Sequence, residues 1–226
     1  MADQDRSKVL LAAHMGKART LLYSFLNTHG VSIPVLAKAM EDFTHTVFAL
    51  PGEAACKAGC HYCCHLRVGV SIPELLVIFN ELQAQASDED LAWFKSRISM
   101  AVEAGDTLTE AFWHKSRTSC PFLDDTGKCL IYIVRPFSCR AYHSNDMAVC
   151  KKGFDERREI QVPCFPLYRA TTDMYSSVFI RVLKEKGYAS YQVGFVKGMS
   201  LLFKDKTLVD KWLNKEDVFK ATALKN

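Results

Sequence analysis

The sequence lacks the long apolar stretches that membrane-spanning segments require. A helix that crosses a bilayer needs about 20 consecutive, mostly apolar residues, and no run of this kind occurs. The apolar residues 9–13 are too few for the hydrophobic part of a secretory signal, and His14 and Lys17 follow them closely. We therefore expect a cytoplasmic protein that has no membrane segment.

The chain also has little excess charge and no low-complexity segment. Its formal net charge is +4, and the basic residues are spread along the chain, with a mild lysine excess after Lys184. Proteins that bind nucleic acid usually gather such residues into a patch, so a nucleic-acid partner is not expected. Apolar residues make up 49% of the 226 residues, enough for the core of one large domain or of a domain with an appended helical part.

Internal repeats and alternating strand and helix patterns are missing as well. Their absence argues against a doubly wound sheet or a (β/α) barrel. Apolar residues instead recur at helical spacing, for example in residues 17–28, 35–48 and 168–183. We therefore expect a mainly α protein: a helical domain with a cysteine-rich metal site built from loops, and at most a short hairpin.

Capping and turn residues refine this expectation. Ser71 and Glu74 match the S-x-x-E capping box and should open a helix. Residues 106–117 should form a further short helix, and residues 130–134 should form one short strand.

Changes in the residue pattern along the chain divide it into three parts. Pro51-Gly52 ends the first helical region, and helical periodicity returns at Leu167. The expected parts are N-terminal helices over 1–50, a cysteine-cluster metal-binding domain over 51–165, and C-terminal helices over 166–226 that pack on the same domain.

Against this helical background, the nine cysteines are clustered rather than scattered. The first group is Cys56, Cys60, Cys63 and Cys64, the second is Cys120, Cys129 and Cys139, and Cys150 and Cys164 complete the set. Four of them stand beside or near glycine or proline, namely Cys60, Cys120, Cys129 and Cys164, and loop backbone can fold several thiolates around one point. In a reducing cytoplasm such clusters indicate metal binding or catalysis before they indicate disulfides.

The chemistry of the thiolate explains why cysteines would be grouped in this way. Thiolates are soft, strong donors for zinc, iron and iron–sulfur clusters, and four of them close a zinc site or hold a four-iron cluster. One local motif rarely supplies a complete shell, so we expect the second group to complete the first. Adjacent side chains diverge, so Cys63 and Cys64 should not serve one ion equally. About eight thiolates would suffice for two such sites, although the sequence does not require two.

The cysteines also lie in recognisable motifs. The first reads Cys56-Lys-Ala-Gly-Cys60-His-Tyr-Cys63-Cys64-His65, and the second combines Cys120-Pro-Phe-Leu, Gly127-Lys-Cys129-Leu-Ile-Tyr132 and Arg135-Pro136-Phe-Ser-Cys139-Arg140. Over about residues 50–155 the chain resembles the YkgJ-type cysteine-cluster family, also called CxxCxxCC, described as a zinc- or iron-chelating domain. Three residues, rather than the two in the family's name, separate Cys56 from Cys60.

The resemblance implies a set of ligands and a kind of partner. Arg135 and Arg140 match motif positions, and a guanidinium near an anionic thiolate site can donate hydrogen bonds to sulfur. Some family members are described as flagellin lysine methylases, which implies another protein as substrate or partner. The implied metal ligands are Cys56, Cys60, Cys63, Cys64, Cys120, Cys129 and Cys139, with Cys150 behind them, whereas Cys164 is expected to matter little and His61, His65 and His143 are weaker candidates.

Three other readings of the cysteine spacing fit less well. Cys56-x3-Cys60-x2-Cys63 also matches the cluster motif of radical S-adenosylmethionine enzymes, but no strand–helix alternation follows it. The C-x-x-C at Cys60 lacks the strand pattern of a thioredoxin. A c-type haem site would need histidine where Cys64 stands.

The sequence thus predicts a metal-binding protein that chelates an iron–sulfur cluster or zinc through clustered thiolates. An iron–sulfur cluster is favoured, because nearly all candidate ligands are sulfur and because zinc sites commonly pair two C-x-x-C knuckles, of which this chain has one. Such a cluster could support the oxygen-sensitive modification of another protein. The alternative is a zinc-stabilised, non-enzymatic binding module, and the sequence leaves open whether the protein is an enzyme.

Overall fold

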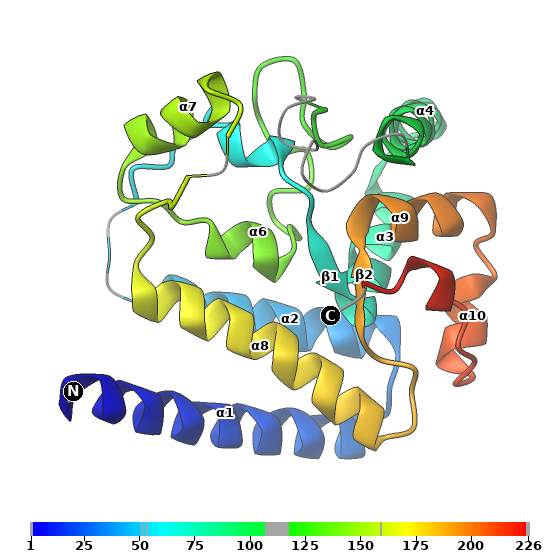
Figure 1. Ribbon diagram of the computed structural model, residues 1–226. Helices are drawn as coiled ribbons and strands as arrows, with labels where there is room; N and C mark the ends of the chain where they lie inside the picture. Colours follow the sequence, from blue (N-terminus) through cyan, green and yellow to red (C-terminus); the bar gives the residue numbers. More distant parts are fainter. Residues whose placement is uncertain (1, 51, 53, 107–117, 159, 225–226) are drawn as a thin grey trace.

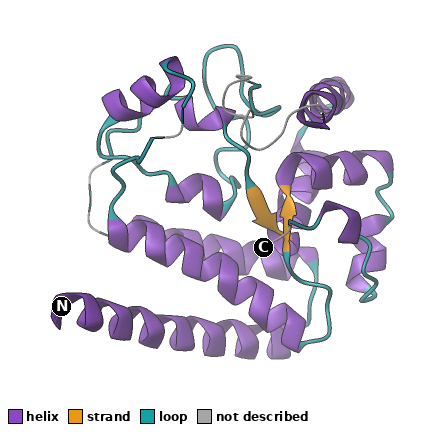
Figure 2. Ribbon diagram, in the orientation of Figure 1, coloured by secondary structure: helices purple, strands orange, loops and turns teal. Residues whose placement is uncertain are grey.

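In the computed structural model the chain is mainly helical, as expected, and its cysteines lie largely in loops (Figures 1 and 2). The structure describes residues 2–50, 52, 54–106, 118–158 and 160–224. Apart from Asp106, the helix expected over residues 106–117 lies outside this part of the chain. The helices are α1 (Ala2–His29), α2 (Ile33–Phe48), α3 (Ile72–Gln85), α4 (Asp88–Asp106), α6 (Phe137–Ala141), α7 (Met147–Asp155), α8 (Pro166–Glu185), α9 (Phe195–Lys204) and α10 (Leu208–Leu213), with short 3-10 turns η1 (Tyr62–His65) and η2 (Lys220–Thr222).

Helices α1, α2 and α8 form the base of the molecule in the view of Figure 1. Each presents an apolar stripe, as its periodicity predicts; Leu22 on α1 and Leu36 on α2 are buried. The Phe43 ring of α2 stacks on Tyr175 of α8 with 4.2 Å between the ring centroids. The cysteine-bearing segments lie on the opposite side of α8 from α1 (Figure 1).

Helix α3 is the central helix of the fold, and its first half is buried on every side. It begins with the capping box that the sequence predicts: the Ser71 backbone N–H and hydroxyl donate to Glu74 at 3.0 and 2.6 Å. The Glu74 carboxylate also accepts from the Phe137 N–H at 2.8 Å and from the Ser176 hydroxyl at 3.0 Å. One buried carboxylate thus ties α3 to α6 and to α8.

Over the described residues there is one small sheet, made of β1 (Gly69–Ser71) and β2 (Gln192–Gly194). The two strands are antiparallel, and Val70 pairs with Val193. They join the start of α3 to the start of α9, far apart in the sequence. The C-terminal segment extends this contact through a bridge between Val193 and Ala223.

The short strand expected over residues 130–134 is wrong. This segment forms tight turns instead, with Tyr132 N–H donating to the Cys129 carbonyl at 3.3 Å and Val134 N–H to the Ile131 carbonyl at 3.1 Å. Ile131 is 5% exposed, whereas Ile133 is 82% exposed, so one side chain anchors the turn and the other points to solvent. A short apolar run looks the same in a turn and in a strand when only the sequence is read.

One hydrophobic core draws on residues from α1 to the C-terminal segment, including Leu22, Leu76, Phe122, Phe179 and Phe219. Among the described helices, none combines the length and apolar character needed to span a membrane.

Candidate metal centre

The first cysteine group lies in a compact loop that leads into η1. The Cys60 N–H donates to the Lys57 carbonyl at 2.9 Å, and Gly59 takes a positive φ of 86° that closes this turn. Cys63 and Cys64 lie on η1, where the Cys64 N–H donates to the His61 carbonyl at 2.9 Å. The loop thus presents four thiols within one turn-rich segment.

Backbone contacts bring the second group against η1. The Cys120 N–H donates to the Cys64 carbonyl at 2.7 Å. Cys129 pairs with Leu123 across a tight loop, and both Cys120 and Cys129 pack against the hydrophobic core. Cys139 lies on α6, whose first N–H is held by Glu74. The thiols of Cys63, Cys120, Cys129 and Cys139 come from four segments and are close enough for their charges to act on one another in every pair; we call them the inner set.

The remaining cysteines gather around Ser144. The thiol of Cys56 donates to the carbonyl oxygens of Tyr142 and Ser144, each at 3.8 Å. Ser144 forms an antiparallel bridge with Cys164. Burial raises the pKa of Cys150 on α7, and the nearby Ser144 side chain acts to lower it. Charge interactions link Cys60 to Cys56 and Cys150, and link Cys164 to Cys56 and Cys150. We call Cys56, Cys60, Cys150 and Cys164 the outer set.

Burial keeps most of these thiols protonated when no cation is beside them. It raises the pKa of Cys120 to about 12 and that of Cys60 to about 11, and it raises the pKa of Cys139 well above its ordinary value. A hydrogen bond with Cys64, followed by burial, does the same for Cys63. A metal ion binds the thiolate form, so binding here would be accompanied by release of protons.

All nine cysteines are free thiols. Within the described ranges, no three His, Cys, Asp or Glu side chains already stand as an assembled coordination shell. The sets are therefore neighbourhoods of sulfur atoms, and closing a shell around a metal requires the thiols to turn about their side-chain bonds.

The two motif arginines have different roles. Arg140 is 1% exposed and donates from Nε to the Arg135 carbonyl at 3.1 Å and from Nη2 to the Ile133 carbonyl at 2.5 Å. Burial, followed by the charge of Arg135, lowers the pKa of Arg140 to about 10. These contacts hold the backbone before α6, so Arg140 is a structural residue.

Arg135 instead faces the inner set. Its Nε is buried and has no hydrogen-bond partner, and its charge acts to lower the pKa values of Cys63, Cys129 and Cys139. A buried guanidinium N–H without an acceptor is costly, and thiolate or sulfide sulfur would satisfy it. The residues present therefore fit an anionic sulfur-ligated metal group.

The histidines border the site without joining either set. The rings of His61 and His65 pack on Phe154 of α7, with centroids 5.8 and 4.7 Å away, and His65 Nδ1 lies 3.2 Å from the His61 carbonyl oxygen. His143 packs on Tyr168 at 4.3 Å. The Nδ1 atoms of His61 and His143 and the Tyr168 hydroxyl are buried and without partners.

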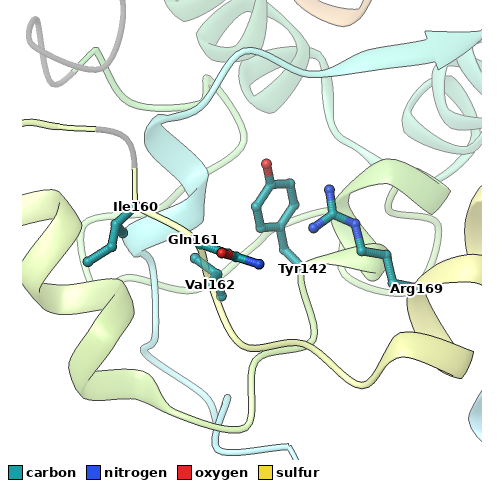
Figure 3. A pocket seen from close by; sticks show the side chains of 5 residues that line it. All are labelled: Tyr142, Ile160, Gln161, Val162 and Arg169. Atoms are coloured by element: carbon teal, nitrogen blue, oxygen red, sulfur yellow. The ribbon is translucent and has the colours of Figure 1, made fainter.

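A hollow of about 440 Å³ opens beside the outer set (Figure 3). Figure 3 shows the guanidinium of Arg169 turned toward the Tyr142 ring, at 5.6 Å from its centroid, with residues 160–162 across from them. The hollow adjoins the thiols, because Tyr142 contacts Cys56 and because the charge of Arg169 acts on Cys164. The hollow is therefore a neighbour of the outer set, and its lining is Tyr142, Arg169 and residues 160–162.

Reasoning from the sequence missed Cys164 and Ser144 as parts of this arrangement. Cys164 follows Pro163, and a neighbouring turn residue is the same signal that marked the other cysteines. Ser144 carries no such signal, because its importance lies in the carbonyl and N–H contacts of its backbone.

Comparison with known proteins bears on this arrangement. No curated protein and no solved structure matches the chain. A protein-family model does match, and the match runs from residue 55 to residue 164, from the start of the first cysteine loop to the last cysteine. Residues 55–164 are therefore similar to the CxxCxxCC family, described as "Putative zinc- or iron-chelating domain", as the two cysteine motifs indicate.

Proposed function

We propose that the protein binds an iron–sulfur cluster through its clustered thiolates, and that this cluster supports the modification of another protein. The observation that carries the proposal is the inner set: four thiols from four segments of the chain, facing the unpartnered Nε of Arg135. All four donors are sulfur, the donor type that iron–sulfur clusters take. When bound, such a cluster supplies electron transfer and, where one iron lacks a protein ligand, a site for a small molecule.

The residues around the inner set would perform three tasks. Cys63, Cys120, Cys129 and Cys139 would hold the cluster. Arg135 would donate a hydrogen bond to sulfur, which lowers the electron density there and raises the reduction potential. Phe122, which is fully buried beside Cys120 in the chain, would help to exclude water.

An exposed apolar turn supports a protein partner. Leu130, Tyr132 and Ile133 are 48%, 52% and 82% exposed, and they directly follow Cys129. Grouped apolar side chains at a surface commonly mark sites of protein interaction. This turn offers a docking surface beside the inner set.

The second candidate function is a zinc-stabilised binding module. It is favoured by the way in which both sets join elements that are distant in the sequence, as a structural ion would. In that case the site would be closed and silent to reduction.

Anaerobic reduction separates the two functions. We expect protein made and handled without oxygen to be coloured, to bleach with dithionite, and to give an electron paramagnetic resonance signal, which is then recorded again with S-adenosylmethionine. A colourless protein with stoichiometric zinc and no signal would defeat the proposed redox function and leave the binding module. A signal that ignores S-adenosylmethionine would retain the cluster and reject this small molecule as its ligand.

A further inference from the structure

Ser144 joins three segments of the outer set. It is 1% exposed, and its carbonyl oxygen accepts from the Ala55 N–H at 2.9 Å while lying 3.8 Å from the Cys56 sulfur. On its other side it pairs with Cys164, and the neighbouring Asn145 N–H donates to the Pro163 carbonyl at 3.0 Å. Residues paired across such a bridge have Cα atoms about 4.5–5.5 Å apart, so Cys56 and Cys164 flank the same residue.

The start of α7 brings in the third segment. The Ser144 hydroxyl accepts from the Asp146 N–H at 3.0 Å, and Asp146 caps α7 by accepting from the Ala148 N–H at 2.8 Å. Cys150 therefore begins the second turn of a helix whose first turn is fixed to Ser144. Burial raises the pKa of the Cys150 thiol, and the nearby Ser144 side chain acts to lower it. Cys60 approaches from the loop before η1 and interacts with Cys56 and Cys150.

The inner set is built from different contacts. It depends on the bond from Cys120 to Cys64, the loop that pairs Leu123 with Cys129, and the position of Cys139 on α6. Cys63 lies between the sets, because its charge also acts on Cys60, Cys150 and Cys164. Cys64 neighbours Cys63 in the chain, and its carbonyl oxygen accepts from the Cys120 N–H.

We propose that the thiols form two metal centres, an inner one held by Cys63, Cys120, Cys129 and Cys139 and an outer one held by Cys56, Cys60, Cys150 and Cys164. The assignment rests on the proposed metal-binding function and deepens it. Each centre takes zinc or an iron–sulfur cluster through four thiolates. Cys164 is then a ligand and Cys64 is a positioning residue, contrary to what the sequence motif suggests.

The outer centre is the one that adjoins a surface hollow. The hollow is lined by Tyr142 and Arg169, and of these Tyr142 contacts Cys56 and the charge of Arg169 acts on Cys164. The inner centre packs against the core and receives the hydrogen bond of Arg135.

Counting metal per chain in matched variants of the full-length protein tests the division. Cys164→Ser should lose the metal of the outer centre, Cys139→Ser should lose the metal of the inner centre, and the double variant should lose nearly all of it. Cys64→Ser, the control, should keep more metal than either. Circular dichroism of each variant checks that the helices are intact.

The possible results separate this proposal from the function on which it rests. Cys164→Ser with the full metal content, or with none, would overturn the two-centre division while leaving metal binding in place. Wild-type protein without iron or zinc would overturn both. If Cys139→Ser does not fold, cobalt(II) titration of metal-free wild-type and Cys164→Ser protein decides. The division is supported if the wild type binds two equivalents with thiolate absorption and Cys164→Ser binds one. Equal numbers in the two proteins contradict it.

Discussion

The backbone N–H of Phe137 donates a 2.8 Å hydrogen bond to the buried carboxylate of Glu74, which lies 63 residues earlier in the chain. Glu74 also caps its own helix, and Phe137 begins the helix that carries Cys139. The most buried part of the core thereby fixes the position of a thiol of the inner set.

Replacing this carboxylate should weaken both the fold and the site. Glu74→Gln places an amide NH₂, which cannot accept a hydrogen bond, among the donors of Ser71, Phe137 and Ser176. The free energy of unfolding in urea should therefore fall by about 2–3 kcal/mol. The bound metal should fall with it, because α6 loses its anchor. Glu103→Gln, at an exposed position of α4, is the matched control and should change neither quantity. Unchanged stability of Glu74→Gln would show that the carboxylate is not the anchor.

A glycine sets how closely the second cysteine loop approaches the first. Gly127 has a φ of 79°, and a Cβ there would lie 3.0 Å from the Gly59 carbonyl oxygen and 3.2 Å from Cδ2 of His61. Gly127→Ala should cost about 1–2 kcal/mol from the backbone conformation alone and should lower metal affinity. Gly16→Ala, in open space on α1, should instead stabilise the protein by about 0.5–1 kcal/mol. Urea unfolding and metal titration of both variants check this contrast.

The arginine that faces the inner set should affect the reduction potential of the cluster without contributing to the stability of the fold. Arg135→Leu removes a donor and a positive charge beside the thiols, so the reduction potential of the cluster should become more negative. Arg181→Leu, which removes an exposed charge from α8, should leave the potential near that of the wild type. Potentiometric titration measures both. Equal potentials in all three proteins would mean that the unpartnered Nε of Arg135 does not contact sulfur.

Neighbouring isoleucines distinguish the buried and exposed sides of the turn after Cys129. Ile131→Asp should destabilise the protein by more than about 2 kcal/mol, because a charge would be buried. Ile133→Asp should stay within about 0.5 kcal/mol of the wild type and keep its metal. The difference between the two melting temperatures checks the turn; similar losses in both variants would contradict it, because residues 131 and 133 would share one face of a strand.

Local signals could be read from the sequence, whereas long-range pairings could not. Ser71 and Glu74 are three residues apart, and their capping box is found as predicted. The same carboxylate also binds Phe137 and Ser176, and no pattern in a single sequence marks partners at that separation. The helical stripes were equally local, whereas the apolar run at 130–134 suited a strand and a turn alike.

The cysteine site shows the same limit. Motif spacing predicts which residues bind metal, and that remains a prediction, but spacing could not assign these residues to neighbourhoods. That assignment depends on the Cys64–Cys120 backbone bond and on the pairing of Ser144 with Cys164, both of which form only when the chain folds. In the sequence Cys164 lies outside the motifs. In the folded chain it lies near Cys56, because Ser144 contacts both.

Removal of the metal should loosen the part of the fold that the thiols join. We expect chelation to lower the melting temperature by several degrees and to speed hydrogen exchange in residues 56–70 and 120–140, with α1 and α8 less affected. Unchanged melting and unchanged exchange in those two segments would remove the structural role of the site.

The most direct test of metal binding is the quantity of iron, zinc and acid-labile sulfide per chain in wild-type protein purified without oxygen. The account predicts iron and sulfide in near-equal amounts, and it predicts that both fall sharply when Cys120 and Cys139 are replaced by serine. Protein that contains neither iron nor zinc, or metal that is unchanged by these two replacements, would contradict it.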